Sequence, residues 1–202
     1  MPDQPDMATR FRGYLPVVVD FETGGFDPLS HAILEVGMVH VGFENGHLIP
    51  TSRFRKAIHA YPGSSIDPAS LKVTGIDPND PERGAVDEKT ALQEMFTDVR
   101  AAMKVAGCQR AIMVAHNAAF DQQFLSVAVE RNALKRNPFH PFSFIDTASL
   151  AAVAFGHTVL SEACKRADIE FDNAQAHSAL YDAEQTARLF CEVVNRWERV
   201  QS

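Results

Sequence analysis

Two acidic residues stand at the end of an apolar run near the start of the chain. Three valines, Val17–Val19, lead directly into Asp20, and Glu22 follows two positions later. Because side chains alternate across a strand with a period of two, both carboxylates project from the same face. Two carboxylates held side by side repel each other unless a cation neutralises them. Oxygen ligands of this kind suit Mg²⁺ or Mn²⁺ better than zinc, although acids at exposed strand ends are also ordinary.

Two further aspartates are candidates to complete a metal site with Asp20 and Glu22. Asp121 lies in AHNAAFD, just after a second apolar run, in the first turn of a predicted helix. The helix dipole alone also favours an acid at that position. Asp182 lies in AHSALYD, directly before the apolar stripe of the last predicted helix, where an unpaired carboxylate is costly and a metal would remove the cost. A solvated helix position is the alternative for Asp182.

His177 is the fifth group that the spacing singles out. It precedes Asp182 by five residues, and five steps of about 100° place two side chains far apart around a regular helix. We therefore expect His177 on the loop that leads into the helix, from where it can reach over a metal site without binding the metal. An ordinary surface histidine, one of eight in the chain, is the alternative.

The elements that must position these groups alternate along the chain. Apolar runs and turn signals predict an antiparallel three-stranded meander within residues 14–60. Beyond it, an apolar run predicts a strand at RAIMVAHN, and PFSFIDTASLAAVAFG reads as a strand that leads into a helix. Helical periodicity and capping signals predict further helices at DPASLKV, 87–107, 118–134, SEACKRAD and the C-terminal stripe Ala183, Ala187, Phe190, Val194 and Trp197. A meander followed by alternating strands and helices predicts an α/β fold with a mixed sheet. We expect residues 1–13 to form a flexible arm and residues 14–200 a single domain.

Length, charge and cysteine content bound the function. A single core accounts for the 202 residues. The net charge of −7 argues mildly against a protein coated in nucleic acid, although basic residues cluster locally. Three well-separated cysteines fit neither a disulfide framework nor a thiolate zinc site and indicate a reducing cytoplasm. The sequence shows neither a signal peptide nor an apolar run of the roughly 18 residues that a membrane span needs.

Together these groups resemble the DEDDh exonucleases of the ribonuclease H-like fold. The Asp-x-Glu pair on a strand, a helical Asp, and a His five residues before the last Asp fit that family. A sister branch has Tyr four residues before that Asp, where this chain has Ser178. Five segments, covering most of the chain from about Phe11 onward, look more specifically like the ribonuclease T family: VDFETGGFDPLSHAILEVG, GIDPNDPERGAV, RAIMVAHNAAFD, RNPFHPFSFIDTA and AHSALYDAEQTARLFCEVVNRW.

The resemblance implies a mixed five-stranded sheet flanked by helices and a 3′→5′ exoribonuclease. It implies two Mg²⁺ ions, with Mn²⁺ as an alternative, and His177 as the general base. The carboxylates that would hold the metal are Asp20, Glu22, Asp121 and Asp182. The products would be nucleoside 5′-monophosphates. The expected substrates are single-stranded 3′ ends of structured RNAs, in tRNA end turnover and the maturation of tRNA, 5S, 23S and other small stable RNAs, together with single-stranded DNA.

Aromatic residues are the expected contacts of the substrate bases. By resemblance, Phe26, Phe120 and Phe142 occupy positions where the family stacks terminal bases. From the residues alone, Phe26 in its Gly-rich turn is the better candidate, because Phe120 lies on a helical stripe typical of a core. Two positions depart from the family: Val73 stands where it has a further Phe, and Ala69 where it has an acidic residue.

Basic residues would supply the remaining contacts with RNA. The family acts as a homodimer in which basic residues of one subunit grip RNA bound at the other's site. The residues that look like this patch are Arg10, Arg12, Lys104, Arg110, Lys135 and Arg136. Taken cluster by cluster, solvated faces are the alternative.

Two other functions remain open at this point. A DNA proofreading or repair exonuclease would use the same carboxylates, but GIDPNDPERGAV and RNPFHPF are not catalytic patterns and favour the ribonuclease T family. A catalytically silent nucleic-acid-binding module would be expected to have lost a carboxylate, and all four are present with the histidine.

Overall fold

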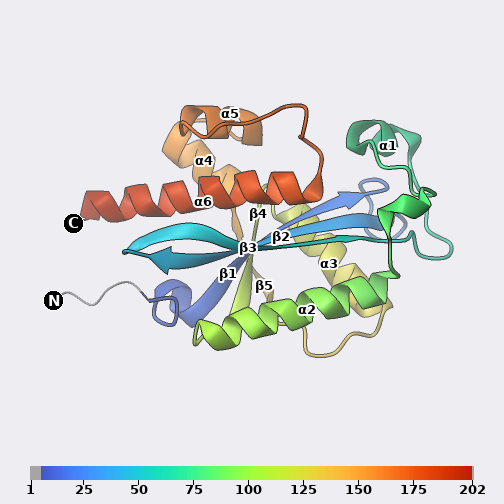
Figure 1. Ribbon diagram of the computed structural model, residues 1–202, viewed down its shortest axis with the longest axis horizontal. Helices are drawn as coiled ribbons and strands as arrows, with labels where there is room; N and C mark the ends of the chain where they lie inside the picture. The colour runs from blue at the N-terminus through green and yellow to red at the C-terminus, as the bar shows by residue number, and fades with distance from the viewer. Residues whose placement is uncertain (1–5, 202) are drawn as a thin grey trace.

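The fold is a five-stranded mixed sheet with helices on both faces, seen in a computed structural model that describes residues 6–201. The strand order is β3-β2-β1-β4-β5, in which β1, β2 and β3 form the predicted antiparallel meander and β4 and β5 extend it in parallel (Figure 1). The strands are β1 (Tyr14–Thr23), β2 (Ile33–Glu44), β3 (His47–Ala57), β4 (Arg110–Ala115) and β5 (Phe139–Asp146). The predicted mixed five-stranded sheet is therefore confirmed.

Helices form the two outer layers. The helices are α1 (Pro68–Thr74), α2 (Glu88–Val105), α3 (Ala119–Arg131), α4 (Thr147–Phe155), α5 (Leu160–Arg166) and α6 (Ala179–Gln201), with 3-10 turns η1 (Arg10–Gly13) and η2 (Pro81–Arg83). α6 lies along one face of the sheet with α4 and α5 beyond it, and α2 lies along the other face (Figure 1). Among the described residues, no helix has both the length and the apolar character needed to cross a bilayer.

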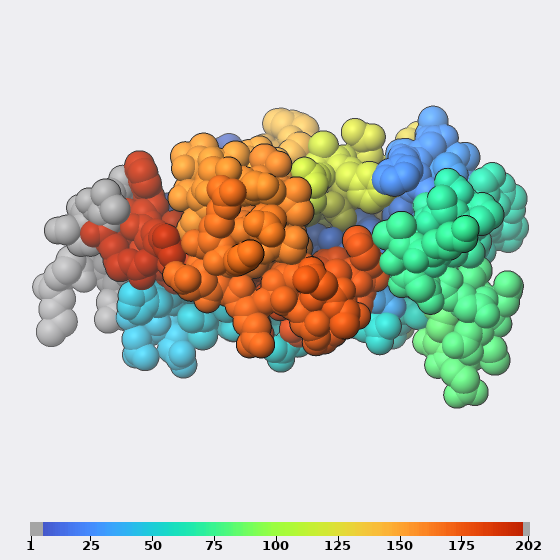
Figure 2. Space-filling model, turned by 90° about the horizontal axis from the view of Figure 1, so that it is seen from above, coloured from blue at the N-terminus to red at the C-terminus, as the bar shows by residue number. Residues whose placement is uncertain are grey.

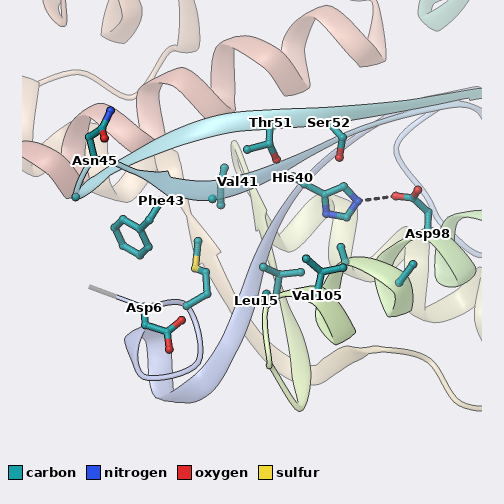
Figure 3. A pocket seen from close by; sticks show the side chains of 16 residues that line it. Asp6, Leu15, His40, Val41, Phe43, Asn45, Thr51, Ser52, Asp98 and Val105 are labelled. Atoms are coloured by element: carbon teal, nitrogen blue, oxygen red, sulfur yellow. Dashed lines mark hydrogen bonds and ion pairs between the residues drawn. The ribbon is translucent and has the colours of Figure 1, made fainter. Parts of the chain in front are cut away.

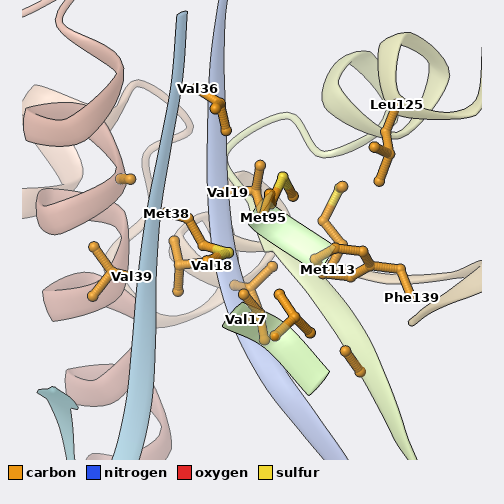
Figure 4. Close-up of a cluster of buried hydrophobic side chains, with 14 of the residues drawn as sticks. Val17, Val18, Val19, Val36, Met38, Val39, Met95, Met113, Leu125 and Phe139 are labelled. Carbon is orange, nitrogen blue, oxygen red and sulfur yellow. The ribbon is translucent and has the colours of Figure 1, made fainter. Parts of the chain in front are cut away.

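The valine run makes β1 a stiff, fully buried strand. Val17, Val18 and Val19 have no exposed surface, and their β-branched side chains allow few rotamers. Val18 lies opposite Val39 of β2, which points toward α6 (Figure 4). Directly opposite residues share a face of the sheet, so Val18, and with it Asp20 and Glu22, lies on the α6 face.

The apolar stripe of α6 is buried along most of its length. Ala183, Ala187, Phe190 and Val194 are each at most 8% exposed. Trp197, the last residue of the predicted stripe, is 59% exposed. The prediction was wrong for Trp197, since periodicity locates a helix face but not the point at which the sheet beneath it ends.

Gly37 allows α6 to approach β2 closely. A Cβ atom at Gly37 would lie 2.1 Å from the carbonyl oxygen of Ala179, the first residue of α6. We expect Gly37→Ala to lower the free energy of unfolding by about 2–3 kcal/mol, because the added methyl group displaces the first helical turn. Urea denaturation measures this, with Gly42→Ala of the same strand as control, where the new Cβ meets only the Thr51 methyl group. Equal losses in the two variants would contradict this packing.

The predicted N-terminal arm of residues 1–13 is only partly described, because residues 1–5 lie outside the described residues. Within residues 6–13, Met7 is 6% exposed and packs into the core, and Arg10–Gly13 forms η1. The flexibility of the arm and the boundary at residue 14 stay predictions.

Candidate active site

Three carboxylates from two elements converge where β1 ends. Each of Asp20, Glu22 and Asp182 offers an oxygen atom, and these atoms lie within 4.8 Å of one another. β1 supplies the first two and the first turn of α6 supplies the third. The convergence follows from the alternation of β1 and from the close approach of α6 to β2.

Asp121 joins this cluster from the first turn of α3. Its Oδ1 accepts a hydrogen bond of 3.0 Å from the backbone N–H of Phe21, the residue between the two acids of β1. Asp121 is 3% exposed, and its charge acts on that of Asp20. The structure thus brings all four sequence-predicted carboxylates together at one end of the sheet.

Burial raises the pKa of all four carboxyl groups. The pKa of Asp20 lies well above its usual range, first because of burial and then because of the charges of Asp121, Glu22 and Asp182. Burial raises the pKa of Glu22 to about 7 and that of Asp121 to about 8. It also raises the pKa of Asp182, against which the hydrogen bond from His177 acts. Packing four acids together is therefore costly unless a cation compensates their charge.

The donor set fits a hard divalent cation. All candidate ligands are carboxylate oxygens, the type that Mg²⁺ and Mn²⁺ prefer. Oδ1 of Asp182 is buried and has no hydrogen-bond partner among the described residues, whereas Oδ2 accepts the backbone N–H of His177 at 2.9 Å. A buried carboxylate oxygen without a hydrogen-bond donor fits a site in which a metal ion supplies the missing contact.

His177 lies on the loop before α6, as the spacing predicts. The side chain is exposed, and the helix begins only at Ala179. The backbone of His177 is left-handed, with φ of 66°, which is uncommon for a residue with a side chain. Such strain persists where surrounding contacts hold it, here the bond to Asp182, and is frequent at functional sites.

The three predicted stacking residues differ in exposure. Phe26 and Phe142 are 82% and 78% exposed. Phe120 is half-buried, with its ring centroid 6.2 Å from that of Phe26 and 4.8 Å from that of the buried Phe124. Phe120 therefore links the exposed ring to the core. Figure 2 looks onto a hollow bordered by the loop after β1, α1, the start of α3 and the loop before α6.

The predicted basic patch lies away from the carboxylates of the same chain. Arg110 pairs with Tyr14 in the first residue pair of β4 and β1, and Arg12 precedes Tyr14 by two residues, at the opposite end of β1 from Asp20. Arg10 pairs with Glu198, its Nε lying 3.1 Å from Oε1. The remaining members lie at the end of α2 (Lys104) and in the loop between α3 and β5 (Lys135 and Arg136). The structure therefore does not bring the patch to the acids.

Sequence reasoning missed a fifth buried acid. Glu35 of β2 lies directly opposite Glu22, is 3% exposed, and accepts a hydrogen bond of 2.7 Å from Arg55 Nη2. Its charge contributes to the raised pKa of Glu22. An acid inside the otherwise apolar run AILEVGMV was the available signal. Arg83, from the segment GIDPNDPERGAV, donates to the carbonyl oxygen of the adjacent Leu34 at 2.6 Å and ties that segment to the same strand.

Asp146 was also missed, and it fixes the turn that precedes Asp121. Its Oδ1 accepts the backbone N–H groups of Asn117 and Ala118 at 2.9 and 3.3 Å, and it also caps the start of α4. The sequence signal was an acid at the end of a strand, FID, just before a helix. Asp146 therefore orients α3, and through it Asp121.

A large cavity elsewhere has no part in this site. It measures about 750 Å³ and lies between the β2–β3 hairpin and α2 (Figure 3). Its main polar feature is the contact between His40 Nε2 and Asp98 Oδ2 at 2.5 Å. None of the sequence-predicted site residues lines this cavity, so a large volume does not identify the catalytic site in this protein.

Known proteins share both the sequence and the fold. Residues 17–190 match a protein-family model described as Exonuclease. Ribonuclease T of Escherichia coli (strain K12) is 53% identical over 195 residues, which cover 96% of this chain and 91% of that protein. The nuclease domain of 3′hExo, a DEDDh family member bound to rAMP, superposes with a TM-score of 0.69 at 17% identity, covering 90% of this chain and 92% of that chain. Escherichia coli exonuclease I in complex with a dT13 oligonucleotide gives 0.70 at 17% identity, covering 93% and 42%.

The fold, the match to the exonuclease model and the identity to a ribonuclease T define a 3′→5′ exonuclease of the DEDDh type. The high identity over nearly the whole length narrows this class further. The chain belongs to the ribonuclease T family.

Proposed function

We propose that this enzyme trims the single-stranded 3′ ends of structured RNAs with two divalent cations, Mg²⁺ in the cell, held by its four clustered carboxylates. Asp20, Glu22, Asp121 and Asp182 are the proposed ligands. The observation that carries the proposal is the meeting of the first two with Asp182 within 4.8 Å, in a chain 53% identical to a ribonuclease T.

The chain's own groups then have distinct roles. When bound, the metal ions supply charge stabilisation of the phosphate and lower the pKa of the attacking water. His177 accepts the proton of that water, a role for which an imidazole is suited near neutral pH. The water oxygen forms a bond to phosphorus as the bond from phosphorus to the 3′ oxygen breaks. The products are a nucleoside 5′-monophosphate and a strand one nucleotide shorter with a free 3′-hydroxyl group.

Exposed aromatic rings beside the acids hold the bases of the 3′ end. Phe26 and Phe142 are the proposed stacking platforms, because large exposed rings lose water contacts when a base covers them. Phe120 supports Phe26 from below. Stacking tolerates any base, so single-stranded DNA is a substrate as well.

The wider setting of the reaction is also proposed. Substrates are tRNA ends and the precursors of tRNA, 5S, 23S and other small stable RNAs, and the name of the Escherichia coli relative, Ribonuclease T, supports RNA as the class of substrate. The enzyme acts as a homodimer in the cytoplasm. Separation of the basic patch from the acids of its own chain supports a dimer, and the free, buried thiols of Cys108, Cys164 and Cys191 suit a reducing compartment.

Digestion of matched RNA and DNA tests this function. The substrate is a tRNA-like duplex with a short single-stranded 3′ overhang, incubated with Mg²⁺ or with EDTA, beside a DNA of the same sequence. We expect 5′-mononucleotides from the RNA overhang, arrest at the duplex, and no products in EDTA. Faster digestion of DNA than of RNA would favour a DNA repair enzyme instead, and no digestion of either would leave a binding module.

The terminal base is expected to matter less than in the rest of the family. Val73, 56% exposed on α1, and the exposed Ala69 replace a stacking ring and an acid. Since a stacked base is worth about 1–3 kcal/mol, we expect rates on oligonucleotides ending in C to fall within about fivefold of those ending in A. Val73→Phe with Ala69→Glu should widen the difference. A pronounced stall at terminal C in the parent protein would contradict this expectation.

A further inference from the structure

The segment that carries His177 is an exposed loop between α5 and α6. We call residues 172–177 the histidine loop. In Figure 1 the chain between α5 and α6 passes beyond α6, on the side away from the sheet. Asp172 and the three residues after it are exposed, and so is His177. Because so little of the loop is buried, its position depends on a small number of contacts with its neighbours.

Close packing does not hold the histidine loop against the helix. A cavity of about 510 Å³ is bordered on one side by Asp172 and Gln175 of the loop and on the other by Tyr181, Gln185 and Arg188 of α6. Atoms that face such a space have no van der Waals partners across it. Directed hydrogen bonds must therefore fix the loop.

Two hydrogen bonds fasten the histidine loop to α6, one at each end of the loop. Within residues 6–201, the backbone N–H of Asp172 donates to the hydroxyl oxygen of Tyr181 at 2.5 Å. The backbone N–H of His177 donates to Asp182 Oδ2 at 2.9 Å. The two acceptors are consecutive residues in the first turn of α6. Both ends of the loop are thus tied to the same point of the helix.

The ring of Tyr181 is itself fixed by an aromatic contact. It meets the ring of Phe171 in an edge-to-face arrangement, with 5.4 Å between the centroids and an angle of 71° between the planes. Phe171 packs against a small buried cluster that is built from α4, α5 and α6. The tyrosine ring therefore belongs to the body of the protein, and its hydroxyl group reaches from there to the loop.

The first half of the histidine loop forms a compact turn around Asp172. Its Oδ1 accepts the backbone N–H of Ala174 and its Oδ2 accepts Nε2 of Gln175, both at 2.9 Å. Its carbonyl oxygen also accepts the backbone N–H of Gln175 at 3.1 Å. His177 follows this turn by two residues, so a displacement of Asp172 passes directly to the imidazole.

We propose that Tyr181 is a positioning residue for the reaction. Its hydroxyl group holds Asp172, and through the turn it holds the histidine loop where His177 can accept the proton of the attacking water. The inference rests on the proposed function. The other anchor, Asp182, is itself a proposed metal ligand, so Tyr181 is the anchor that does not depend on the metal site. Tyr181 acts through His177 and takes no proton itself.

A single hydroxyl group separates this role from a structural one. Tyr181→Phe keeps the ring against Phe171 and removes the acceptor of the hydrogen bond. The matched control is Tyr14→Phe, at the opposite end of β1 from the carboxylates. We measure kcat and KM for trinucleotide hydrolysis in Mg²⁺, and repeat the Tyr181→Phe change in the His177→Ala background. Hydrogen exchange of the Asp172 amide in EDTA, followed by NMR, reports the anchor without any turnover.

We expect Tyr181→Phe to lower kcat by about fivefold to tenfold and to leave KM within about twofold, because a lost hydrogen bond frees the loop and a small displacement of a catalytic group slows the chemistry. The Asp172 amide should exchange at least about fivefold faster than in the parent. In the His177→Ala background the same change should cause no further loss. Tyr14→Phe should behave as the parent.

Four results would overturn the inference. The first is a normal kcat in Tyr181→Phe, and the second is unchanged exchange of the Asp172 amide. The third is an equal loss of kcat in the His177→Ala background, which would mean that Tyr181 acts independently of the imidazole. The fourth is a raised KM with an unchanged kcat, which would indicate a substrate contact. Full activity of His177→Ala would overturn the proposed role of His177 and this inference with it, whereas the four results above leave that role intact.

Discussion

Asp20→Asn is expected to lower kcat by at least about a thousandfold while leaving the protein folded. The charges of Asp121, Glu22 and Asp182 all act on Asp20, and an amide in its place removes both a charge and a proposed metal ligand. Loss of metal-held charge stabilisation at the phosphate removes several kcal/mol from the transition state. Trinucleotide hydrolysis in Mg²⁺ is the measurement.

Asp168→Asn is the matched control for this change. Asp168 is exposed beside α5, and its φ of 60° is one that Asn adopts readily. The control removes the same charge from the chain and should retain activity within about twofold, as surface changes usually do. Similar activity of Asp20→Asn and the parent would show that Asp20 is not in the catalytic site.

The same Asp20 variant should be more stable than the parent when metal is removed. A carboxyl group whose pKa rises on folding favours the folded state while protonated, and this contribution is lost as the pH rises through the folded-state pKa. Because the pKa rises from 4.5 to about 7 at Glu22 and from 3.8 to about 8 at Asp121, the metal-free parent loses stability as the pH rises from about 4 to about 8. Removing the charge of Asp20 relieves this repulsion by about 1–3 kcal/mol.

Denaturation in EDTA at pH 6 and pH 9 measures this effect. We expect the variant to exceed the parent most at pH 9, and Mg²⁺ to stabilise the parent more than the variant. A variant less stable than the parent at pH 9 would contradict this prediction. It would mean that other contacts of the Asp20 side chain stabilise the fold by more than repulsion from the other carboxylates destabilises it.

His177→Ala is expected to lower kcat by about 10²–10⁴-fold with little change in KM, because it removes a proton acceptor and leaves the carboxylates and the stacking rings intact. The comparison variant is His177→Asn. Asn tolerates the left-handed backbone at this position and keeps the N–H that bonds to Asp182, so it separates the ring from the loop conformation.

Both variants should lose the same activity and bind Mn²⁺ as the parent does. A normal kcat in His177→Asn would show that the ring takes no proton and that only the backbone of the loop matters.

The parts of the site that sequence predicts are those set by local periodicity. The shared face of Asp20 and Glu22 follows from the two-residue period of a strand, and the loop position of His177 follows from the helical period. The hydrogen bond from the backbone N–H of Phe21 to Asp121 joins residues 100 positions apart. The sequence alone therefore indicates Asp121 as a candidate acid but not Phe21 as its hydrogen-bond partner. Sequence analysis did not identify Glu35, because its position opposite Glu22 depends on the register between β1 and β2. No local sequence pattern specifies that register.

The sequence likewise does not show which basic side chains are paired with acids and which lie together in the fold. Arg10 and Arg12 look alike in sequence, yet Arg10 pairs with Glu198 and Arg12 stands over the ring of Tyr14. Lys89 belongs to no basic cluster in the sequence, and it meets Lys135 and Arg136 only because the α3–β5 loop packs beside α2. Clusters of basic residues along the chain therefore do not indicate which cations the fold brings together.

The most direct test is anomalous diffraction from crystals of the enzyme grown with Mn²⁺ and a nucleoside 5′-monophosphate. We expect two Mn²⁺ peaks roughly 3.5–4 Å apart, bound by Asp20, Glu22, Asp121 and Asp182, with the imidazole of His177 close by but not bound to metal. The absence of Mn²⁺ from this cluster at saturating concentration, with ions bound elsewhere, would contradict the assignment of the active site.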